Sequence, residues 1–319
     1  MDRLTRAGPA EREALALTEP AGTLWQRLRG QLARLRQEQE LRVESWKMGG
    51  GTILAARWRH RRSTDIDLTT SASWQIAELG QSASNVFTEA MEKLGGRLTG
   101  YRKGSIRMAF PDGKLHVYRV GPQPAAGHRV ATIDGEPFEA LSTTQILAGK
   151  LLNRLSETPA RDLYDVVVAG RKDRDGLEQA VNMLDVETQA EAAFLWDGRR
   201  QRIEEDARET LRPISADEPL VVAAEELVDT AIRTIEASRY EKLEVEPARP
   251  GQAARIVTTT TDRGPRSTAV PRARIEEVLE ETGLNQCLEA RYVDVDWFIE
   301  QLHTEREQPT RPGIRTTRS

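Results

Sequence analysis

The stretch MGGGTILAARWRHRRSTDIDL at residues 48–68 decides the fold of this chain. It begins with three glycines, continues with a short apolar helical segment and a basic run, and ends in Asp65-Ile66-Asp67-Leu68. Glycine pairs mark turns, whereas alternating polar and apolar residues indicate a half-buried strand. The stretch therefore predicts a strand, a glycine turn, a helix and a second strand, in that order.

Asp65 and Asp67 are candidate metal ligands because successive side chains of a strand point to opposite faces. Both carboxylates then project from one face, while Ile66 and Leu68 enter the core. Hard cations such as Mg²⁺, or Mn²⁺ in its place, bind oxygen, and one or two carboxylates suffice when phosphates and water complete the shell. Two such ions about 4 Å apart could activate an attacking hydroxyl and stabilise a leaving pyrophosphate.

The glycine turn is a candidate site for a triphosphate. Gly50 and Gly51 lack a Cβ, so the backbone can approach phosphates closely, and the next helix presents N–H groups at its positive end. Thr52 adds a hydroxyl donor. Basic and polar residues just before the carboxylate strand would offset phosphate charge and cap the turn, namely His60, Arg61 and Ser63.

Taken in this order and spacing, the stretch resembles the signature of the AbiEii/AbiGii-type nucleotidyltransferase toxins, a branch of the DNA polymerase β-like nucleotidyltransferase superfamily. A second family motif is a helix lysine followed by Arg-Asp and a further Asp. It is present in AGKLLNRLSETPARDLYDVVV, residues 148–168, as Lys150, Arg161-Asp162 and Asp165. The two motifs together cover about residues 46–170, roughly half of the chain.

The resemblance implies an α+β fold, in which a polymerase β-like core of a small mixed sheet flanked by helices precedes a mostly helical C-terminal region. It also implies a pyrophosphate-releasing, NTP-dependent toxin of a bacterial toxin–antitoxin or phage-defence system. Mycobacterial relatives suggest tRNA as the acceptor, and a cognate antitoxin is a further expected partner.

The second motif also makes physical sense from its residues alone. Lys150 lies on a predicted helix whose leucines form a buried stripe, so its ammonium could reach a phosphate at the edge of a cleft. Asp162 and Asp165 are three residues apart and share a helical face. Two structural alternatives stay open: Lys150 is simply exposed, or Asp162 caps a helix or pairs with Arg161.

One element of the superfamily pattern is absent from the sequence. Members commonly place a third acidic residue on a neighbouring strand, but the predicted hairpin strands, 105–110 and 115–120, contain none. The general base is therefore unassigned. Asp162 or Asp165 could serve, or metal alone could activate the acceptor hydroxyl.

Two other features look like sites but lack the context of one. Asp294-Val-Asp296 repeats the Asp-x-Asp pattern without a glycine turn before it and runs into an apolar stretch, which indicates a strand-to-helix boundary with solvated acids. His116 and His128 are isolated, and a lone histidine is more often structural than catalytic.

Composition places the chain among soluble globular proteins. Its single cysteine, Cys287, excludes an internal disulfide and a cysteine-based zinc cluster. No apolar run approaches the roughly 18 residues of a membrane helix, and the N-terminus lacks a signal-peptide core, so we expect a cytoplasmic protein without a membrane partner. Charge is uneven: residues 42–131 carry a net +7 and residues 132–319 a net −12.

We expect residues 1–140 to form the nucleotidyltransferase core with its N-terminal helix, and residues 305–319 to be a mobile tail. Residues 141–304 should be mostly helical, with a β-hairpin near 243–260. Helical periodicity is found at 23–41, 73–94, 143–155, 160–169, 176–196, 217–238 and 271–282.

The leading functional hypothesis is a metal-dependent nucleotidyltransferase toxin that moves a nucleotide from an NTP to the 3′ end of tRNA or another RNA. An alternative keeps the chemistry and changes the acceptor to a small molecule such as an aminoglycoside, or to a protein side chain. The acidic C-terminal half suits a cationic acceptor of that kind. A non-catalytic binding module is the alternative from a different class.

Overall fold

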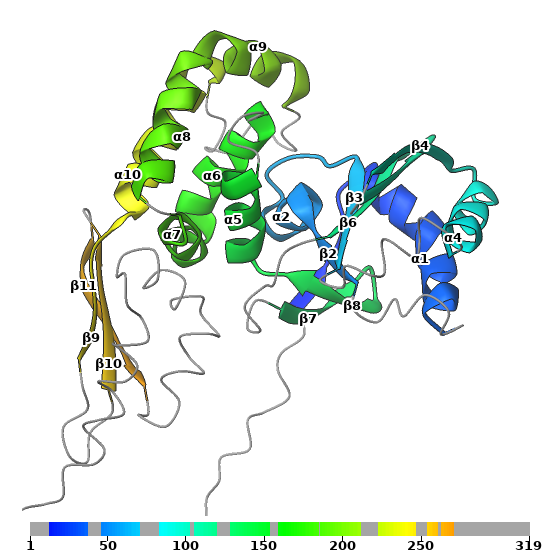
Figure 1. Ribbon diagram of the computed structural model, residues 1–319, viewed down its shortest axis with the longest axis horizontal. Helices are drawn as coiled ribbons and strands as arrows, with labels where there is room; N and C mark the ends of the chain where they lie inside the picture. Colours follow the sequence, from blue (N-terminus) through cyan, green and yellow to red (C-terminus); the bar gives the residue numbers. More distant parts are fainter. Residues whose placement is uncertain are drawn as a thin grey trace, which may run out of the picture.

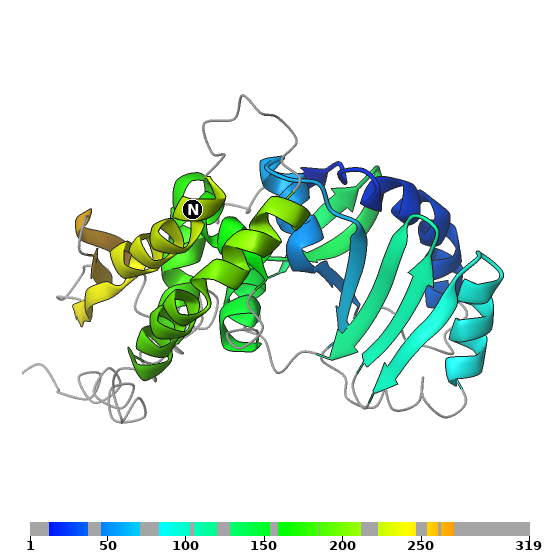
Figure 2. The ribbon, with the colours of Figure 1, turned by 90° about the horizontal axis from the view of Figure 1, so that it is seen from above.

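A computed structural model describes a sheet with its helices, a helical part, and a smaller sheet beyond the helices (Figure 1). The described residues are 13–37, 46–70, 83–102, 105–119, 128–153, 159–184, 186–211, 223–246, 254–260 and 263–270. Figures 1 and 2 both place the smaller sheet on the side of the helices away from the first sheet.

The first sheet has the strand order β1-β7-β8-β2-β3-β6-β5-β4. Its strands are β1 Glu13–Leu15, β2 Lys47–Gly49, β3 Asp65–Thr70, β4 Arg97–Arg102, β5 Ser105–Phe110, β6 Gly113–Arg119, β7 His128–Ile133 and β8 Glu136–Leu141. Strand β3 runs antiparallel to β2 and parallel to β6, so the sheet is mixed. This confirms the predicted fold class.

One face of this sheet is covered by α1 (Ala21–Gln37) and α4 (Ala83–Glu92), which contact each other (Figure 2). The leucines that α1 repeats at helical spacing are fully or almost fully buried there, as the periodicity predicted. Ile66 and Leu68 of β3 are also completely buried, and the two aspartates between and before them are not. Backbone alternation thus leaves both carboxylates on the other face.

The helical part begins where the first sheet ends. Its helices are α5 Thr143–Asn153, α6 Ala160–Lys172, α7 Arg174–Asn182, α8 Val186–Gly198, α9 Arg200–Thr210, a 3₁₀ turn Ala224–Glu226 and α10 Leu227–Ser238. Helix α2 (Gly50–Trp58), which follows the glycine turn, contacts β3, α5 and α6. The turn therefore lies where the sheet and the helices meet.

Several elements differ from the periodicity of the sequence. The helix expected at 176–196 is two helices, and α7 begins early because Asp173 caps it by accepting a hydrogen bond from Gly176 N. Helix α9 and the strands β1, β4, β7 and β8 carry no strong apolar pattern and were not predicted. The expected helix 271–282, the tail 305–319, and Asp294 with Asp296 lie outside the described residues.

The smaller sheet consists of β9 (Tyr240–Glu246), β10 (Ala254–Thr260) and β11 (Arg263–Val270), with β10 in the middle. Antiparallel pairing of β9 with β10 lies where a hairpin was expected, and β11 is an additional strand. No helix within the described ranges is long and apolar enough to cross a bilayer.

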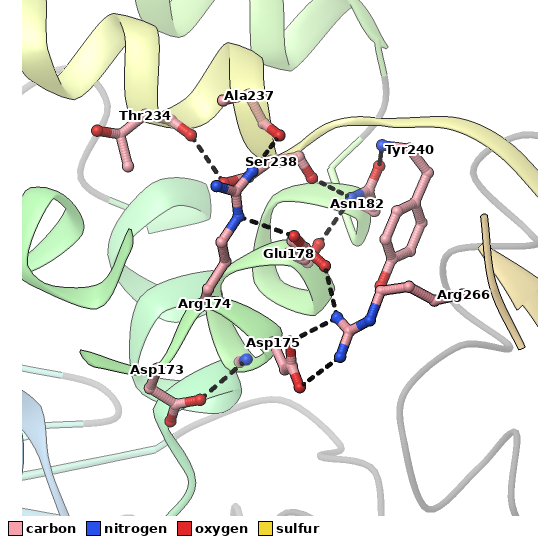
Figure 3. Close-up of polar contacts among 11 residues, drawn as sticks. Asp173, Arg174, Asp175, Glu178, Asn182, Thr234, Ala237, Ser238, Tyr240 and Arg266 are labelled. Carbon is pink, nitrogen blue, oxygen red and sulfur yellow. Dashed lines mark hydrogen bonds and ion pairs between the residues drawn. The ribbon is translucent and has the colours of Figure 1, made fainter. Parts of the chain in front are cut away.

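A buried polar network fixes the smaller sheet to α7 (Figure 3). Asn182 donates to Ser238 O at 2.9 Å and accepts a hydrogen bond from Tyr240 N at 2.8 Å, so it joins the end of α10 to the start of β9. Glu178, with 2% of its side chain exposed, lies between Arg174 at 2.9 Å and Arg266 of β11 at 3.5 Å. Polar side chains thus set the direction in which the chain leaves the helices.

Candidate active site

The two aspartates of β3 share the face of the sheet that α1 and α4 leave uncovered. Their side chains are 26% (Asp65) and 19% (Asp67) exposed, which leaves the carboxylate oxygens within reach of a ligand. In the sheet register, Asp67 is opposite Gly49 of β2 on one side and His116 of β6 on the other. The predicted pair of carboxylates is therefore placed on one face of a central strand.

The glycine turn is in direct contact with this pair. Gly50 has φ +67°, in the left-handed region, and a Cβ on it would lie 2.0 Å from Asp67 Oδ2. A Cβ on Gly51 would lie 2.0 Å from Arg61 Nη2. Gly50 therefore requires glycine because of its backbone angle and its contact with Asp67, whereas a Cβ at Gly51 would displace the guanidinium of Arg61.

Thr52 and Ser63 face each other inside the protein. Their hydroxyl oxygens are 2.7 Å apart, both side chains are buried, and Thr52 also donates to the backbone carbonyl of Asp65. Ser63 N donates to Thr18 Oγ1 at 3.0 Å. These contacts hold the start of β3 against α2. The Thr52 hydroxyl, which was expected to donate to a triphosphate, is therefore already engaged in a structural hydrogen bond.

Asp165 of α6 is the centre of a buried ionic cluster. Its carboxylate accepts two hydrogen bonds from Arg61, from Nε at 2.7 Å and from Nη2 at 2.9 Å. Lys150 Nζ is 3.0 Å from Oδ2, and His60 Nε2 is 2.7 Å from Oδ1. Because Asp165 is completely buried, these three partners supply the stabilisation that water would otherwise give.

The cluster fixes the protonation of its members. Burial would raise the pKa of Asp165, but the charges of Arg61 and Lys150 outweigh it and hold this pKa well below its usual range. Burial lowers the pKa of His60 despite the nearby carboxylate. Burial also opposes ionisation of Arg61, yet Asp165 raises the pKa of that guanidinium.

These contacts make Asp165 a poor general base. A carboxylate with a strongly lowered pKa and both oxygens engaged has little tendency to accept a proton. Asp162, the other expected candidate, makes a close ion pair with Lys150. Arg161 Nη1 lies 3.9 Å from Asp65 Oδ2.

Lys150 is neither simply exposed nor free. Its side chain is 10% exposed and is held between Asp162 and Asp165. With Arg61 behind the glycine turn and Arg161 beside Asp65, it adds to the positive charge around the two aspartates. Such cations are suited to offset the charge of a polyphosphate.

His116 is the residue that the sequence interpretation missed. Its Nδ1 lies 3.6 Å from Asp67 Oδ1, and its Nε2 is buried without a partner among the described residues. It lies on β6, the neighbour of β3, in one of the two strands where the sequence has no third acid. Sequence alone held only a weak signal, since nothing in it pairs residue 116 with residue 67.

The two carboxylates suit a hard divalent ion whose coordination shell is completed by substrate. The described ranges contain no cluster of three or more His, Cys, Asp or Glu side chains that could hold a metal by themselves. Two partly exposed carboxylates on one face leave the remaining ligand positions to phosphate and water, which is the way Mg²⁺ is usually bound.

A mixed sheet that presents two carboxylates beside a glycine turn, with cations around them, defines the class of nucleotidyltransferases. The particular family follows from comparison with known proteins. A sequence model described as "Nucleotidyl transferase AbiEii toxin, Type IV TA system" matches residues 35–244, more than half of the chain. This chain belongs to that family and is a nucleotidyltransferase, as the two motifs predicted.

Other comparisons add little. No curated protein sequence matches this chain. Among solved structures, JHP933 from Helicobacter pylori aligns at 12% identity and a TM-score of 0.40, over 69% of this chain and 93% of that one. The antibiotic-resistance factor ANT(2'')-Ia aligns at 18% identity and a TM-score of 0.33, over 59% and 97%. Similarity at this level carries no information on substrates.

Proposed function

We propose that this chain transfers a nucleotide from an NTP to the 3′ end of tRNA, with a divalent metal ion, and acts as the toxin of a pair with a cognate antitoxin in the cytoplasm. The observation that carries this proposal is the contact between Asp67 and the Gly50 turn on the open face of β3. A cation, a polyphosphate and an attacking oxygen can meet at such a place.

Each residue of the site has a role in this proposal. Asp65 and Asp67 would hold Mg²⁺ or Mn²⁺, which would lower the pKa of the attacking hydroxyl and stabilise the leaving pyrophosphate. Backbone N–H groups at the start of α2 bind the triphosphate, since no side chain caps that helix. Arg61 and Lys150 neutralise it, and Asp165 keeps both of them in position.

The acceptor is an RNA in this proposal because the basic part of the chain contains the two aspartates and the glycine turn. Residues 42–131, which include β3 and the glycine turn, carry the net charge of +7. A positive surface attracts polyanions and repels cationic acceptors such as aminoglycosides. The net −12 of residues 132–319 is the one observation that favours a cationic acceptor.

Transfer of label from each of the four α-³²P-labelled NTPs tests the acceptor directly. The protein is incubated with total tRNA, with an aminoglycoside mixture, or alone with its own side chains as acceptors. We expect label on tRNA, sensitivity to removal of its 3′-terminal nucleotides, and loss of transfer in EDTA that Mg²⁺ or Mn²⁺ restores. Label only on the drug or on protein would overturn the RNA assignment.

Asp67→Asn tests the proposed role of the carboxylates. This change keeps the shape of the side chain and removes its charge, and we expect kcat/KM to fall by roughly 10³-fold, equivalent to about 4 kcal/mol of transition-state stabilisation. The matched control is Asp197→Asn on the exposed surface of α8, which should transfer at the wild-type rate. Wild-type turnover by Asp67→Asn would rule out the proposed metal site.

A further inference from the structure

Strands β6, β5 and β4 follow β3 in the sheet, on the side away from the glycine turn. One face of these three strands continues the face of β3 that carries Asp65 and Asp67. The register places Asp67, His116 of β6 and Arg107 of β5 in one row across the sheet. A neighbouring row contains Asp65, Lys114, Ala109 and Arg97 of β4. Cationic side chains thus extend outward from the site in two parallel rows.

This face is open to solvent along β5 and β6. Arg107 and Lys114 are exposed, whereas their apolar neighbours along each strand are buried on the opposite face. Helices α1 and α4 lie on that opposite side of the sheet (Figure 2). Arg97, at the β4 edge, is exposed as well. A sheet face with exposed cations beside the two carboxylates has room for an extended ligand.

The chemistry of the face is that of a polyanion site. Arg97, Arg107 and Lys114 are its exposed cations, and strands β4, β5 and β6 contain no Asp or Glu. The rings of His116 and Tyr118 lie 4.7 Å apart at 34° to each other, in the line of the cations. Cations together with two ring systems match the phosphates and bases of a single-stranded nucleic acid. A cationic drug finds no counter-charge there.

We propose that the open face of β4–β6, defined by Arg97, Arg107, Lys114, His116 and Tyr118, binds the single-stranded 3′-terminal segment of the acceptor RNA and leads its end to Asp65 and Asp67. This inference rests on the proposed function and assigns a surface to its acceptor. From β3 to β5 is two strand spacings, about 10 Å, which corresponds to a few stacked nucleotides at about 3.4 Å each.

The double variant Arg107→Gln/Lys114→Gln tests this assignment by equilibrium binding of tRNA without NTP, so that no turnover is needed. Both side chains are exposed, so the fold should tolerate the change. We expect about tenfold weaker binding, and a slope of log K against log salt that is smaller by about 1.4, because each lost phosphate contact on a single strand contributes about 0.7. The KM for RNA should rise while the KM for NTP stays at its wild-type value.

Arg202→Gln/Arg233→Gln is the matched control, because it removes two exposed cations from α9 and α10 and should bind tRNA like the wild type. Equal binding by the test variant and the wild type would overturn the assignment, even if tRNA is the acceptor. Photo-crosslinking of tRNA with 4-thiouridine near its 3′ end gives a second measurement on wild-type protein. Crosslinks should map to residues 97–119, and crosslinks confined to other segments would contradict the proposal.

The two proposals fail in different ways. If the wild type labels tRNA but the β5 and β6 cations do not affect its binding, only the surface assignment is wrong. If no RNA is labelled under any condition, the acceptor class of the proposed function is wrong.

Discussion

Two buried carboxylates, Asp165 on α6 and Glu178 on the next helix, α7, connect the helices to different parts of the protein. Asp165 binds side chains from α5 and from the loop before β3, so it joins the helices to the first sheet. Glu178 binds Arg174 of its own helix and Arg266 of β11, so it joins the helices to the smaller sheet (Figure 3). Burial of a charged group needs partners in both places, but only one place adjoins the nucleotide turn.

The partners of the two acids explain the difference. Arg61, held by Asp165, fills the space above Gly51, so any movement of it reaches the turn beside Asp67. Arg174, held by Glu178, instead donates to Ala237 O at 2.7 Å at the end of α10. The same kind of ion pair therefore holds side chains beside the candidate active site in one region, whereas in the other it joins elements of secondary structure.

The largest expected effect comes from removing each acid in turn. Asp165→Asn should lower the free energy of unfolding by about 3–5 kcal/mol, because it leaves the buried Arg61 without a counter-charge. Glu178→Gln should lower it less, because Arg174 and Arg266 are partly exposed and Arg266 keeps its ion pair with Asp175. Only Asp165→Asn should also raise the KM for NTP, since Arg61 and Lys150 are no longer held beside the turn. Urea unfolding and transfer kinetics at a temperature where both variants are folded measure the two effects. Wild-type kinetics in Asp165→Asn, or an equal rise of KM in Glu178→Gln, would remove the distinction.

A smaller effect should appear in the pH dependence of stability. Burial lowers the pKa of His60 in the folded state, whereas an unfolded histidine titrates near pH 6.5. As pH falls below about 6.5, the unfolded chain takes up a proton that the folded chain does not, so the free energy of unfolding falls by up to about 1.4 kcal/mol per pH unit, until the folded pKa is reached.

The lowered pKa of Asp165 acts at lower pH. Its stabilising contribution is present above the unfolded aspartate pKa, about 3.9, and is lost as pH falls through the folded value. His60 and Asp165 therefore change the free energy of unfolding in different pH ranges. His60→Gln should flatten the slope between about pH 6.5 and pH 5 in urea titrations, and an unchanged slope in that variant would show that another group is responsible.

The smallest effect is expected for an ion pair on the surface. Arg208 Nη2 lies 2.6 Å from Glu225 Oε1, but both side chains are at least half exposed, so water replaces the interaction readily. Arg208→Gln should leave both the thermal midpoint and transfer kinetics at wild-type values. A clear drop in the midpoint would mean that burial is not what separates this pair from those of Asp165 and Glu178.

Local sequence was sufficient for the first motif and insufficient for the second. The strand, turn, helix and strand of residues 47–70 lie close together in the chain, and backbone alternation alone places Asp65 and Asp67 on one face. Lys150 and Asp165 were recognised as a pattern, but the ion pair of Asp165 with Arg61 joins residues 104 positions apart in the sequence. No periodicity encodes a contact of that separation.

The edges of the sheet were the hardest part to predict. Strands such as β4, with RLTGYR, have one paired side and an interrupted apolar pattern, so they look like loop in sequence. The sequence interpretation therefore identified residues 42–131 as basic, but it did not predict that the cations of residues 97–119 lie together on one face of a sheet. It also treated His116 as isolated, because the parallel pairing of β6 with β3 depends on a long connection.

The sequence by itself determined the family, the glycine turn and the pair of carboxylates, because motif spacing and strand alternation are properties of neighbouring residues. Tertiary structure decided which cations Asp165 holds, that His116 lies beside Asp67, and that Arg107 and Lys114 share the carboxylate face. Those contacts join residues far apart in the chain, and only the packing of α6 on α2 and of β6 on β3 brings them together.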